Sequence, residues 1–173
     1  MGREPVIDPR ATVPHCRTMA ILLAATVATG LIAGLFFAYA NNVMPALRVM
    51  DDRCFVGTMQ RINTVILNPL FLATFVGGLL LTTASAITVA VRDGSGMVWA
   101  VAAIALYLVM VAITRSVNIP LNIELERAGD VSGVEALHDV RGRFEQRWIT
   151  WNLVRAVASV GAFGCQSVTL LLN

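Results

Sequence analysis

The chain has 173 residues, of which 57% are hydrophobic and 14% are charged. A typical soluble domain carries about 45–50% apolar and about 25% charged residues, and the mean hydropathy of +0.72 departs in the same direction. The net charge of +2 is too small to indicate nucleic-acid binding, and all 13 basic residues are Arg, which excludes chemistry that needs a lysine amine. These features predict a small integral membrane protein.

Four apolar segments are long enough to cross a hydrocarbon core, which needs about 20 residues per helix. We predict an all-α fold: an integral membrane four-helix transmembrane bundle, forming a single domain over residues 18–173 after a flexible N-terminal tail, 1–17. The expected spans are residues 18–40, 65–91, 97–117 and 153–172. Gly30 and Gly34 have the spacing of close helix packing, which we interpret as packing within one chain.

Four spans would place both termini on the same side of the membrane. The two long loops carry seven arginines, and the tail and the short link carry four: Arg48, Arg53, Arg61, Arg127, Arg141, Arg143 and Arg147 against Arg3, Arg10, Arg17 and Arg92. Because cytoplasmic loops are richer in Arg, this excess favours long loops that face the cytoplasm.

The first long loop has an amphipathic pattern. Apolar residues recur there every three to five positions: Leu47, Met50, Phe55, Met59, Ile62 and Ile66. We predict an interfacial amphipathic helix that Asn68-Pro69 bends into the second span. This helix would be either a simple membrane-surface helix or an apolar lid.

The second long loop predicts a helical extension before the fourth span. Ser132-x-x-Glu135 resembles a capping box, and no Pro interrupts the chain from there to Asn173. Helical spacing then places two arginines and three aromatic residues on one stripe: Leu137, Arg141, Phe144, Trp148, Trp151 and Arg155.

The two halves of the chain repeat a pattern. Asn42-Val43-Met44-Pro45 follows the first span and Asn118-Ile119-Pro120 follows the third, and the next spans open with Gln60-Arg61 and Gln146-Arg147. We interpret this pattern as a duplicated helical hairpin with a pseudo-twofold axis along the membrane normal. Chance similarity is the alternative.

Polar residues gather at one end of the predicted bundle. Antiparallel threading brings nine of them to that end: Asn41, Asn42, Asn63, Asn68, Arg115, Asn118, Asn122, Asn152 and Arg155. Polar side chains in spans are costly and usually face a cavity or the bundle interior. Arg155 lies deepest in its span and needs polar partners. The cluster is therefore either a functional pocket or structural glue between helices.

Several kinds of site are not expected. The three cysteines are isolated, with no Cys-x-x-Cys pair, so a thiol–disulfide redox enzyme is not expected. Two histidines outside the spans do not make a di-haem bundle. Glu124, Glu126, His138 and Glu145 match no metal-ligand spacing, so solvated loop charges are the preferred interpretation. No metal-binding or cofactor-binding residue is predicted.

The motifs Asn118-Ile119-Pro120-Leu121-Asn122 and Trp148-x-x-Trp151-Asn152-x-x-Arg155 resemble those of the anthrone-oxygenase-like family of small four-helix membrane proteins. The resemblance extends over nearly the whole chain, from about residue 18 to 172. It implies oxidation of an anthrone methylene to an anthraquinone carbonyl by molecular oxygen, with no established cofactor. The implied partners are the lipid bilayer and a small lipophilic aromatic substrate.

The resemblance also suggests roles for individual residues. Arg155, with Asn152 and Asn118, would hold the enolate oxygen. Trp148 and Trp151 would stack on the substrate rings, and three further amides would line its site: Asn122, Asn63 and Asn42. His138 or Glu124 would be the base. The competing hypothesis is a non-catalytic membrane module, or an accessory or permeation subunit, whose Asn/Arg cluster only fixes helix packing.

Overall fold

The structure is a computed structural model that describes residues 9–92, 94–129 and 136–173, and all regular secondary structure in these residues is helical. The α-helices are α1 (Pro9–Ala38), α2 (Met44–Arg48), α3 (Asp52–Val65), α4 (Pro69–Val91), α5 (Met97–Ile113), α6 (Ile119–Arg127) and α7 (Leu137–Leu171). Two π-helical turns, Tyr39–Val43 and Thr114–Asn118, join α1 to α2 and α5 to α6. The prediction of an all-α fold is confirmed.

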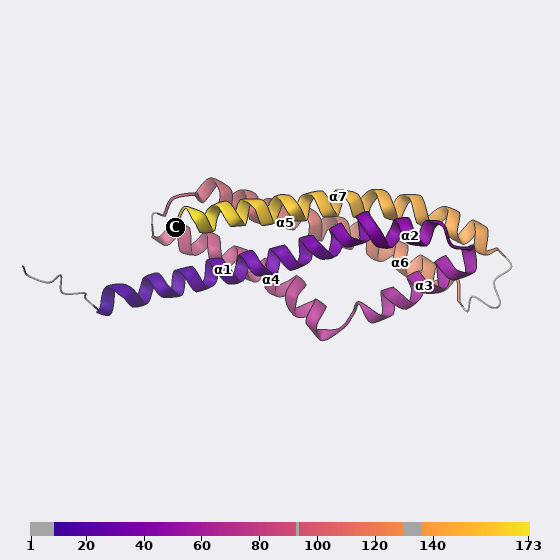
Figure 1. Cartoon of the computed structure of the whole chain (residues 1–173), viewed down its shortest axis with the longest axis horizontal. Helices are drawn as coiled ribbons and strands as arrows, with labels where there is room; N and C mark the ends of the chain where they lie inside the picture. The colour runs from indigo at the N-terminus through magenta and orange to yellow at the C-terminus, as the bar shows by residue number, and fades with distance from the viewer. Residues whose placement is uncertain (1–8, 93, 130–135) are drawn as a thin grey trace, which may run out of the picture.

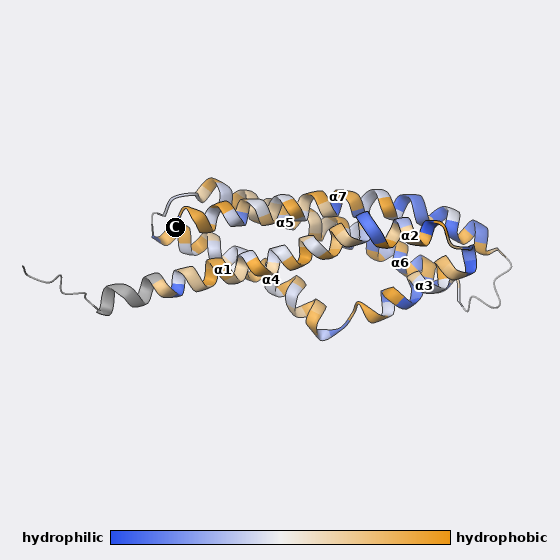
Figure 2. Ribbon diagram, in the orientation of Figure 1, coloured by the Kyte–Doolittle hydropathy of each residue, from blue (hydrophilic) through white to orange (hydrophobic). Residues whose placement is uncertain are grey.

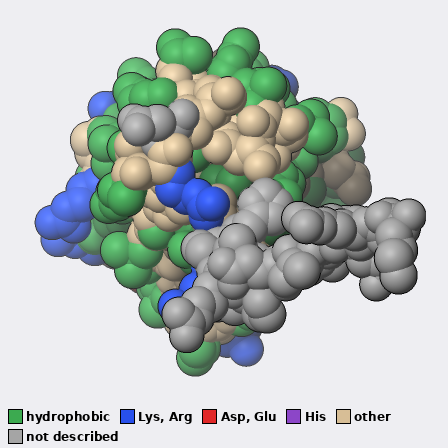
Figure 3. Space-filling view, turned by 90° about the vertical axis from the view of Figure 1, so that its left-hand side faces the viewer, with side chains coloured by type: hydrophobic (Ala, Val, Ile, Leu, Met, Phe, Trp, Pro, Cys, Tyr) green, Lys and Arg blue, Asp and Glu red, His purple; other side chains and the backbone are tan. Residues whose placement is uncertain are grey.

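Four helices are long and apolar enough to cross a membrane, which indicates a multi-pass membrane protein: Cys16–Arg48, Pro69–Val91, Met97–Arg127 and Leu137–Leu171. Helices α1 and α5 run in one direction, and α4 and α7 run in the other (Figure 1). Both α7 and α4 pack against α1 and α5, so α4 and α7 occupy opposite corners of a four-helix bundle. Hydrophobic side chains surround this bundle when it is viewed from the end where α7 terminates (Figure 3), as expected of a surface in contact with lipid.

The helix boundaries differ from the predicted spans in two places. Helix α1 begins at Pro9, so residues 9–17 of the predicted tail are helical. The second span begins at Pro69 instead of residue 65, because the Asn68 side chain caps α4 by accepting a hydrogen bond from the Phe71 N–H (3.0 Å). The chain therefore bends sharply between α3 and α4, and this α3–α4 corner projects away from the bundle (Figure 1).

Close contacts between side chains and backbone hold the four long helices α1, α4, α5 and α7 against one another. The Tyr107 hydroxyl donates to the Phe75 carbonyl (2.7 Å), and it passes so near Gly78 that a Cβ atom there would collide with it. Deeper in the bundle, the Gln166 amide donates to the Ser85 hydroxyl (2.9 Å). A Cβ atom on Gly30 would meet the Phe163 ring at 3.0 Å, so this glycine serves packing within the chain, as predicted. A Cβ atom on Gly34 would meet nothing within 4 Å, so the prediction of close packing is wrong for Gly34.

Helix α7 is longer than a membrane is thick. Its 35 residues span about 52 Å, compared with about 30 Å of hydrocarbon core. The predicted helical extension is thus continuous with the fourth span, although the capping box Ser132–Glu135 lies outside the described residues. The first turns of α7 join α2, α3 and α6 in a helical cap, where hydrophilic residues are concentrated (Figure 2).

The cap has a hydrophobic core of its own. Its buried members come from all four helices: Met44, Leu47, Phe55, Val56, Met59, Leu121, Leu125, Phe144 and Trp148. The predicted amphipathic helix is α3, and its apolar face packs against α6 and α7. The protein itself therefore covers the face that was expected to rest on lipid.

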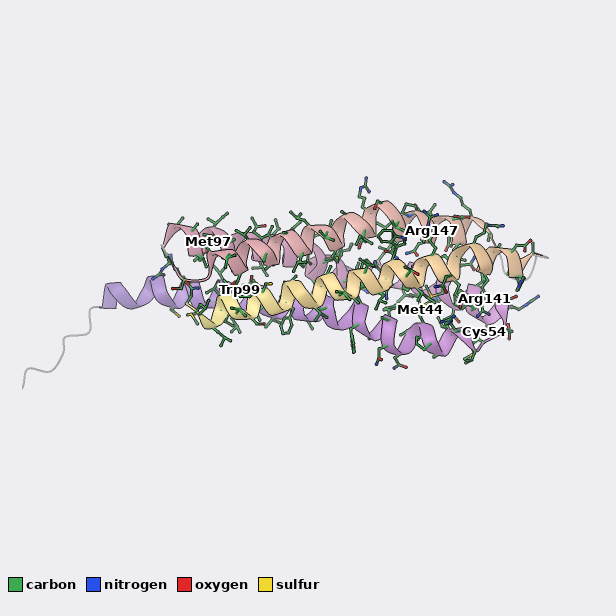
Figure 4. All side chains as sticks on the ribbon, turned by 90° about the horizontal axis from the view of Figure 1, so that it is seen from above. Met44, Cys54, Met97, Trp99, Arg141 and Arg147 are labelled. Carbon is green, nitrogen blue, oxygen red and sulfur yellow. The ribbon has the colours of Figure 1, made fainter. Side chains whose placement is uncertain are left out.

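Arg141 ties the segment between α2 and α3 to α7. Its guanidinium, 12% exposed, donates to the carbonyl oxygens of Arg48 (2.9 Å) and Met50 (2.8 Å) and to the carboxylates of Asp52 (2.9 Å) and Glu145 (2.6 Å). It also lies 4.4 Å from the Phe55 ring centroid, and Figure 4 shows Arg141 and Cys54 at the cap end. We call these interactions the Arg141 clamp.

Replacing Arg141 with Met should loosen the cap. The substitution keeps an apolar stem near Phe55 but removes four hydrogen bonds, so the free energy of unfolding should fall by about 2 kcal/mol in mild detergent. Arg143→Met is the matched control, because Arg143 is 62% exposed and lies 3.6 Å from Glu124. That control should change the free energy by less than about 0.5 kcal/mol, and equal effects of the two variants would contradict the clamp.

Acidification should weaken the same contacts. The hydrogen bond with His138, followed by the interaction with Arg141, holds the pKa of the Asp52 carboxyl below its usual value. Asp52 therefore stabilises the fold above its unfolded-state pKa of about 3.9, and this contribution disappears as the pH falls through the lower, folded-state pKa. Chemical unfolding of wild type and Asp52→Asn should differ at neutral pH and converge below about pH 4; a difference that widens in acid would contradict this assignment.

Candidate functional site

A cavity of about 180 Å³ lies between the α3–α4 corner and the rest of the bundle. The corner supplies one apolar wall, Ile62, Ile66, Leu67, Phe71, Leu72 and Phe75, together with Asn63. The opposite wall comes from α1, the two π turns, α6 and α7, and it contains Phe36, Tyr39, Thr114, Asn118, Asn122, Trp148 and Arg155. A single water needs about 10–15 Å³, so the space is large enough for an organic molecule.

Two prolines explain why the helices are distorted beside this cavity. Pro45 and Pro120 each follow a π turn by two positions, and the residue between them closes the turn: the Met44 N–H bonds to the Tyr39 carbonyl and the Ile119 N–H to the Thr114 carbonyl. A proline ring would clash with the carbonyl four residues earlier in a regular α-helix. The wider π turn relieves this clash, and such turns are frequent at functional sites.

Arg155 is the only described charged side chain that lines the cavity. It is 6% exposed, and its Nη2 donates to Asn152 Oδ1 (2.8 Å) while its Nη1 lies 3.4 Å from Thr114 Oγ1. The guanidinium carbon sits 4.2 Å from the Phe36 ring centroid and 5.6 Å from the Trp148 ring centroid. No described carboxylate pairs with Arg155, so neutral dipoles and aromatic faces alone surround its positive charge.

Asn152 holds Arg155 in place without lining the cavity. Its Oδ1 accepts the hydrogen bond from Arg155, and its Nδ2 donates to the Phe36 carbonyl (3.3 Å). The same side chain therefore links α7 to α1. This geometry makes Asn152 a positioning residue that fixes the guanidinium from behind.

Unused hydrogen-bonding capacity is concentrated at the cavity. Five buried side-chain N or O atoms in the described part of the chain have no hydrogen-bond partner: Asn63 Nδ2, Asn118 Nδ2, Asn118 Oδ1, Arg155 Nε and Gln166 Oε1. The first four belong to cavity-lining residues. Asn118 is 1% exposed and has both amide atoms unpaired, and each such atom costs about 1–3 kcal/mol. The protein thus tolerates a local loss of stability that a polar ligand would reverse.

Aromatic side chains form much of the remaining wall. Trp148 donates from Nε1 to Asn122 Oδ1 (2.9 Å), and its ring centroid lies 5.9 Å from that of Tyr39. On the facing wall, the ring centroids of Phe71 and Phe75 are 5.5 Å apart. A flat apolar molecule could contact rings on both sides of this space.

The structure brings together five of the predicted site residues at the cavity: Arg155, Asn118, Asn122, Asn63 and Trp148. It places the other predicted residues elsewhere. Asn152 lies behind Arg155, while Trp151 is 37% exposed and Asn42 also faces outward.

The two candidate bases do not reach this group. His138 is 91% exposed and lies 3.1 Å from Asp52 in the cap. It precedes Arg155 by 17 residues on the same helix, about 25 Å along the axis, and this separation places it far from the cavity. Glu124 pairs with Arg143 at the surface (3.6 Å).

Three cavity residues that contact Arg155 or Trp148 were not predicted as site residues. Phe36 and Thr114 contact Arg155 directly, and Tyr39 lies against Trp148. Phe36 and Tyr39 precede Asn41-Asn42, and Thr114 precedes Arg115. Their nearness to the predicted polar cluster was the sequence signal that could have identified them.

Among the described residues, no group of three or more His, Cys, Asp or Glu side chains could hold a metal ion.

Comparison with known families places the chain in one of them. The family model described as anthrone oxygenase matches residues 69–165, more than half of the chain. This region runs from the start of α4 into α7 and contains Asn118, Trp148 and Arg155. No curated protein and no solved structure matches the chain. The match confirms the resemblance noted in the sequence: the chain belongs to the anthrone oxygenase family.

Proposed function

We propose that the protein is a membrane-embedded oxygenase that oxidises a lipophilic aromatic substrate of the anthrone type with molecular oxygen. In this reaction the methylene carbon loses two hydrogen atoms and gains one oxygen atom, and the second oxygen atom leaves as water. Family membership supports this reaction class. The observation that carries the proposal is the buried Arg155, without a described carboxylate partner, in the wall of a mostly apolar cavity.

Arg155 would stabilise the charge that develops on the substrate. Removing a proton from the methylene of an anthrone leaves negative charge on the ketone oxygen, and this enolate is electron-rich enough to react with oxygen. A fixed cation in a site that excludes water stabilises such charge far more than it could in water. Asn118 would donate to the same oxygen, and Trp148 would contact the substrate rings.

The substrate would reach the cavity sideways from the bilayer. Three cavity-lining residues, Leu67, Leu72 and Ile119, are both exposed and apolar. They would form an opening that a lipophilic molecule can cross without entering water. We also propose, from the arginine excess in the long loops, that the cap lies on the cytoplasmic side of the membrane.

The alternative, a non-catalytic membrane module with an Asn/Arg cluster that serves packing, makes a different structural prediction. A cluster that only joins helices should have its side chains hydrogen-bonded to one another with no space between them. Here a cavity separates the walls, and four polar atoms of its lining residues are unpaired. These observations favour a ligand site.

Substitution of Arg155 tests the proposal. Oxygen uptake by the purified protein in the presence of anthrone should exceed the spontaneous rate, and Arg155→Ala should lower this excess by about 100-fold or more, the typical loss when a group that stabilises an oxyanion is removed. Arg155→Lys should retain part of the activity because it keeps the charge. Arg147→Ala, an exposed position on the same helix, should retain the wild-type rate. Wild-type kinetics in folded Arg155→Ala protein would rule out the assigned role.

Substitution of Asn118 separates a ligand site from structural glue. Asn118→Leu removes two buried, unpaired polar atoms, so the unliganded protein should become more stable by about 1 kcal/mol or more. The same variant should lose most of its oxygen uptake. Thermal unfolding and oxygen consumption measured on one preparation provide both values, and a less stable variant with full activity would favour the packing role.

A further inference from the structure

We propose that the cavity binds its ligand as an anion. An acidic aromatic molecule releases its proton to water when it binds, and no base in the described cavity wall accepts that proton. The choice of an aromatic ligand rests on the proposed oxygenase function. The inference that the ligand binds in its charged form rests on the unpaired hydrogen-bond donors and the charge of the cavity wall.

The unpaired groups in the wall are mainly donors. Arg155 Nε, Asn118 Nδ2 and Asn63 Nδ2 each have an N–H without a described acceptor, whereas Asn118 Oδ1 is the one unpaired acceptor among the fully buried side-chain atoms of the described lining residues. Three donors and one acceptor match a ligand rich in acceptor oxygens that keeps one hydroxyl. An ionised oxygen is the best acceptor for such a set, because hydrogen bonds to a charged group are roughly twice as strong as neutral ones.

The charge of the described wall also favours an anionic ligand. Arg155 contributes one positive charge, and Tyr39 is the only other titratable side chain among the described lining residues. Arg61 on α3 and Arg115 beside Thr114 are exposed and do not line the cavity. The described wall therefore has no carboxylate to neutralise Arg155, and a bound anion would complete the ion pair.

Anion binding also accounts for the composition of the catalytic wall. The described lining residues include neither His, Asp nor Glu, the usual proton acceptors. If the ligand binds as its anion, the neutral molecule releases its proton as the ring system enters the cavity, and the proton passes to water at the membrane surface. The electron pair of the broken O–H or C–H bond stays on the ligand, where Arg155 stabilises it.

A coloured acid measures this selection directly. The probe is 1,2-dihydroxyanthraquinone, whose absorption spectrum reports its ionisation, titrated with excess full-length protein in non-ionic detergent. An apolar cavity alone would raise the pKa of a bound acid, whereas an anion site lowers it, so the sign decides between them. We expect a bound-state pKa about 1 below that of the free probe, equivalent to roughly tenfold tighter binding of the anion.

Variants assign the effect to its source. Arg155→Gln should abolish the lowering of the probe's pKa, and Arg155→Lys should keep at least part of it. Arg147→Gln removes an equal charge from an exposed position on α7 and should change nothing. Tyr39 is the other titratable residue in the described wall, so a lowering of the probe's pKa that persists in Arg155→Gln and disappears in Tyr39→Phe would overturn the proposal.

The outcomes separate this proposal from the oxygenase function. A lowered probe pKa in a protein without oxygen uptake would support anion binding and overturn the oxygenase. A raised or unchanged probe pKa, or no binding by folded wild-type protein, would overturn anion binding even where oxygen uptake is normal. Micelles without protein are measured in parallel, because partition into detergent by itself raises the pKa of an acid.

Discussion

The positive charge of Arg155 is the constraint around which the cavity end of the bundle is organised. A charged side chain inside an apolar bundle is costly unless polar groups surround it. Here Asn152, Thr114 and the faces of Phe36 and Trp148 provide that surrounding, and each comes from a different turn or helix. The charge can thus remain buried without a described acidic partner. It is then available for a ligand, while the neutral residues around it hold the helices together.

Much of the fold follows from the sequence, because hydropathy and antiparallel threading fix both the spans and the end where polar residues meet. The identity of the residues that face the cavity is harder to derive. Each π turn adds one residue to a helical turn, which rotates everything after it by about 100°. A prediction that assumes a regular helix therefore assigns the residues after Tyr39 to the wrong helix face. In the structure Asn42 faces outward, while Asn118, at the end of its own π turn, is buried.

Similar ambiguity affects the long fourth helix. Steps of three and four residues both continue a helical stripe, and the step from Trp148 leads to Asn152 in the structure instead of to Trp151. The distance of His138 from Arg155 was available from the sequence, since it follows from the continuity of the helix. The cavity itself depends on how far the α3–α4 corner stands from the bundle, which local sequence patterns do not specify.

Both halves of the chain contain a π turn followed by a proline, but the chain folds differently after each of them. Both have a π turn two residues before a proline, at Pro45 and at Pro120, which is consistent with a duplicated hairpin. Asn68-Pro69 then breaks the helix in the first half, whereas α7 continues unbroken in the second. The broken half supplies the displaced apolar wall, and the continuous half supplies Arg155 in the wall opposite.

The continuity of α7 has a mechanical consequence. Arg141 and Arg155 are separated by 14 residues, close to four full turns and about 21 Å, so they project from the same face of one stiff rod. Any twist of the rod about its axis would have to break the contacts of both residues together. The contacts of Arg141 in the cap therefore fix the rotation of α7 about its axis. This rotation in turn sets the direction in which the Arg155 guanidinium points, about 21 Å away in the apolar part of the bundle.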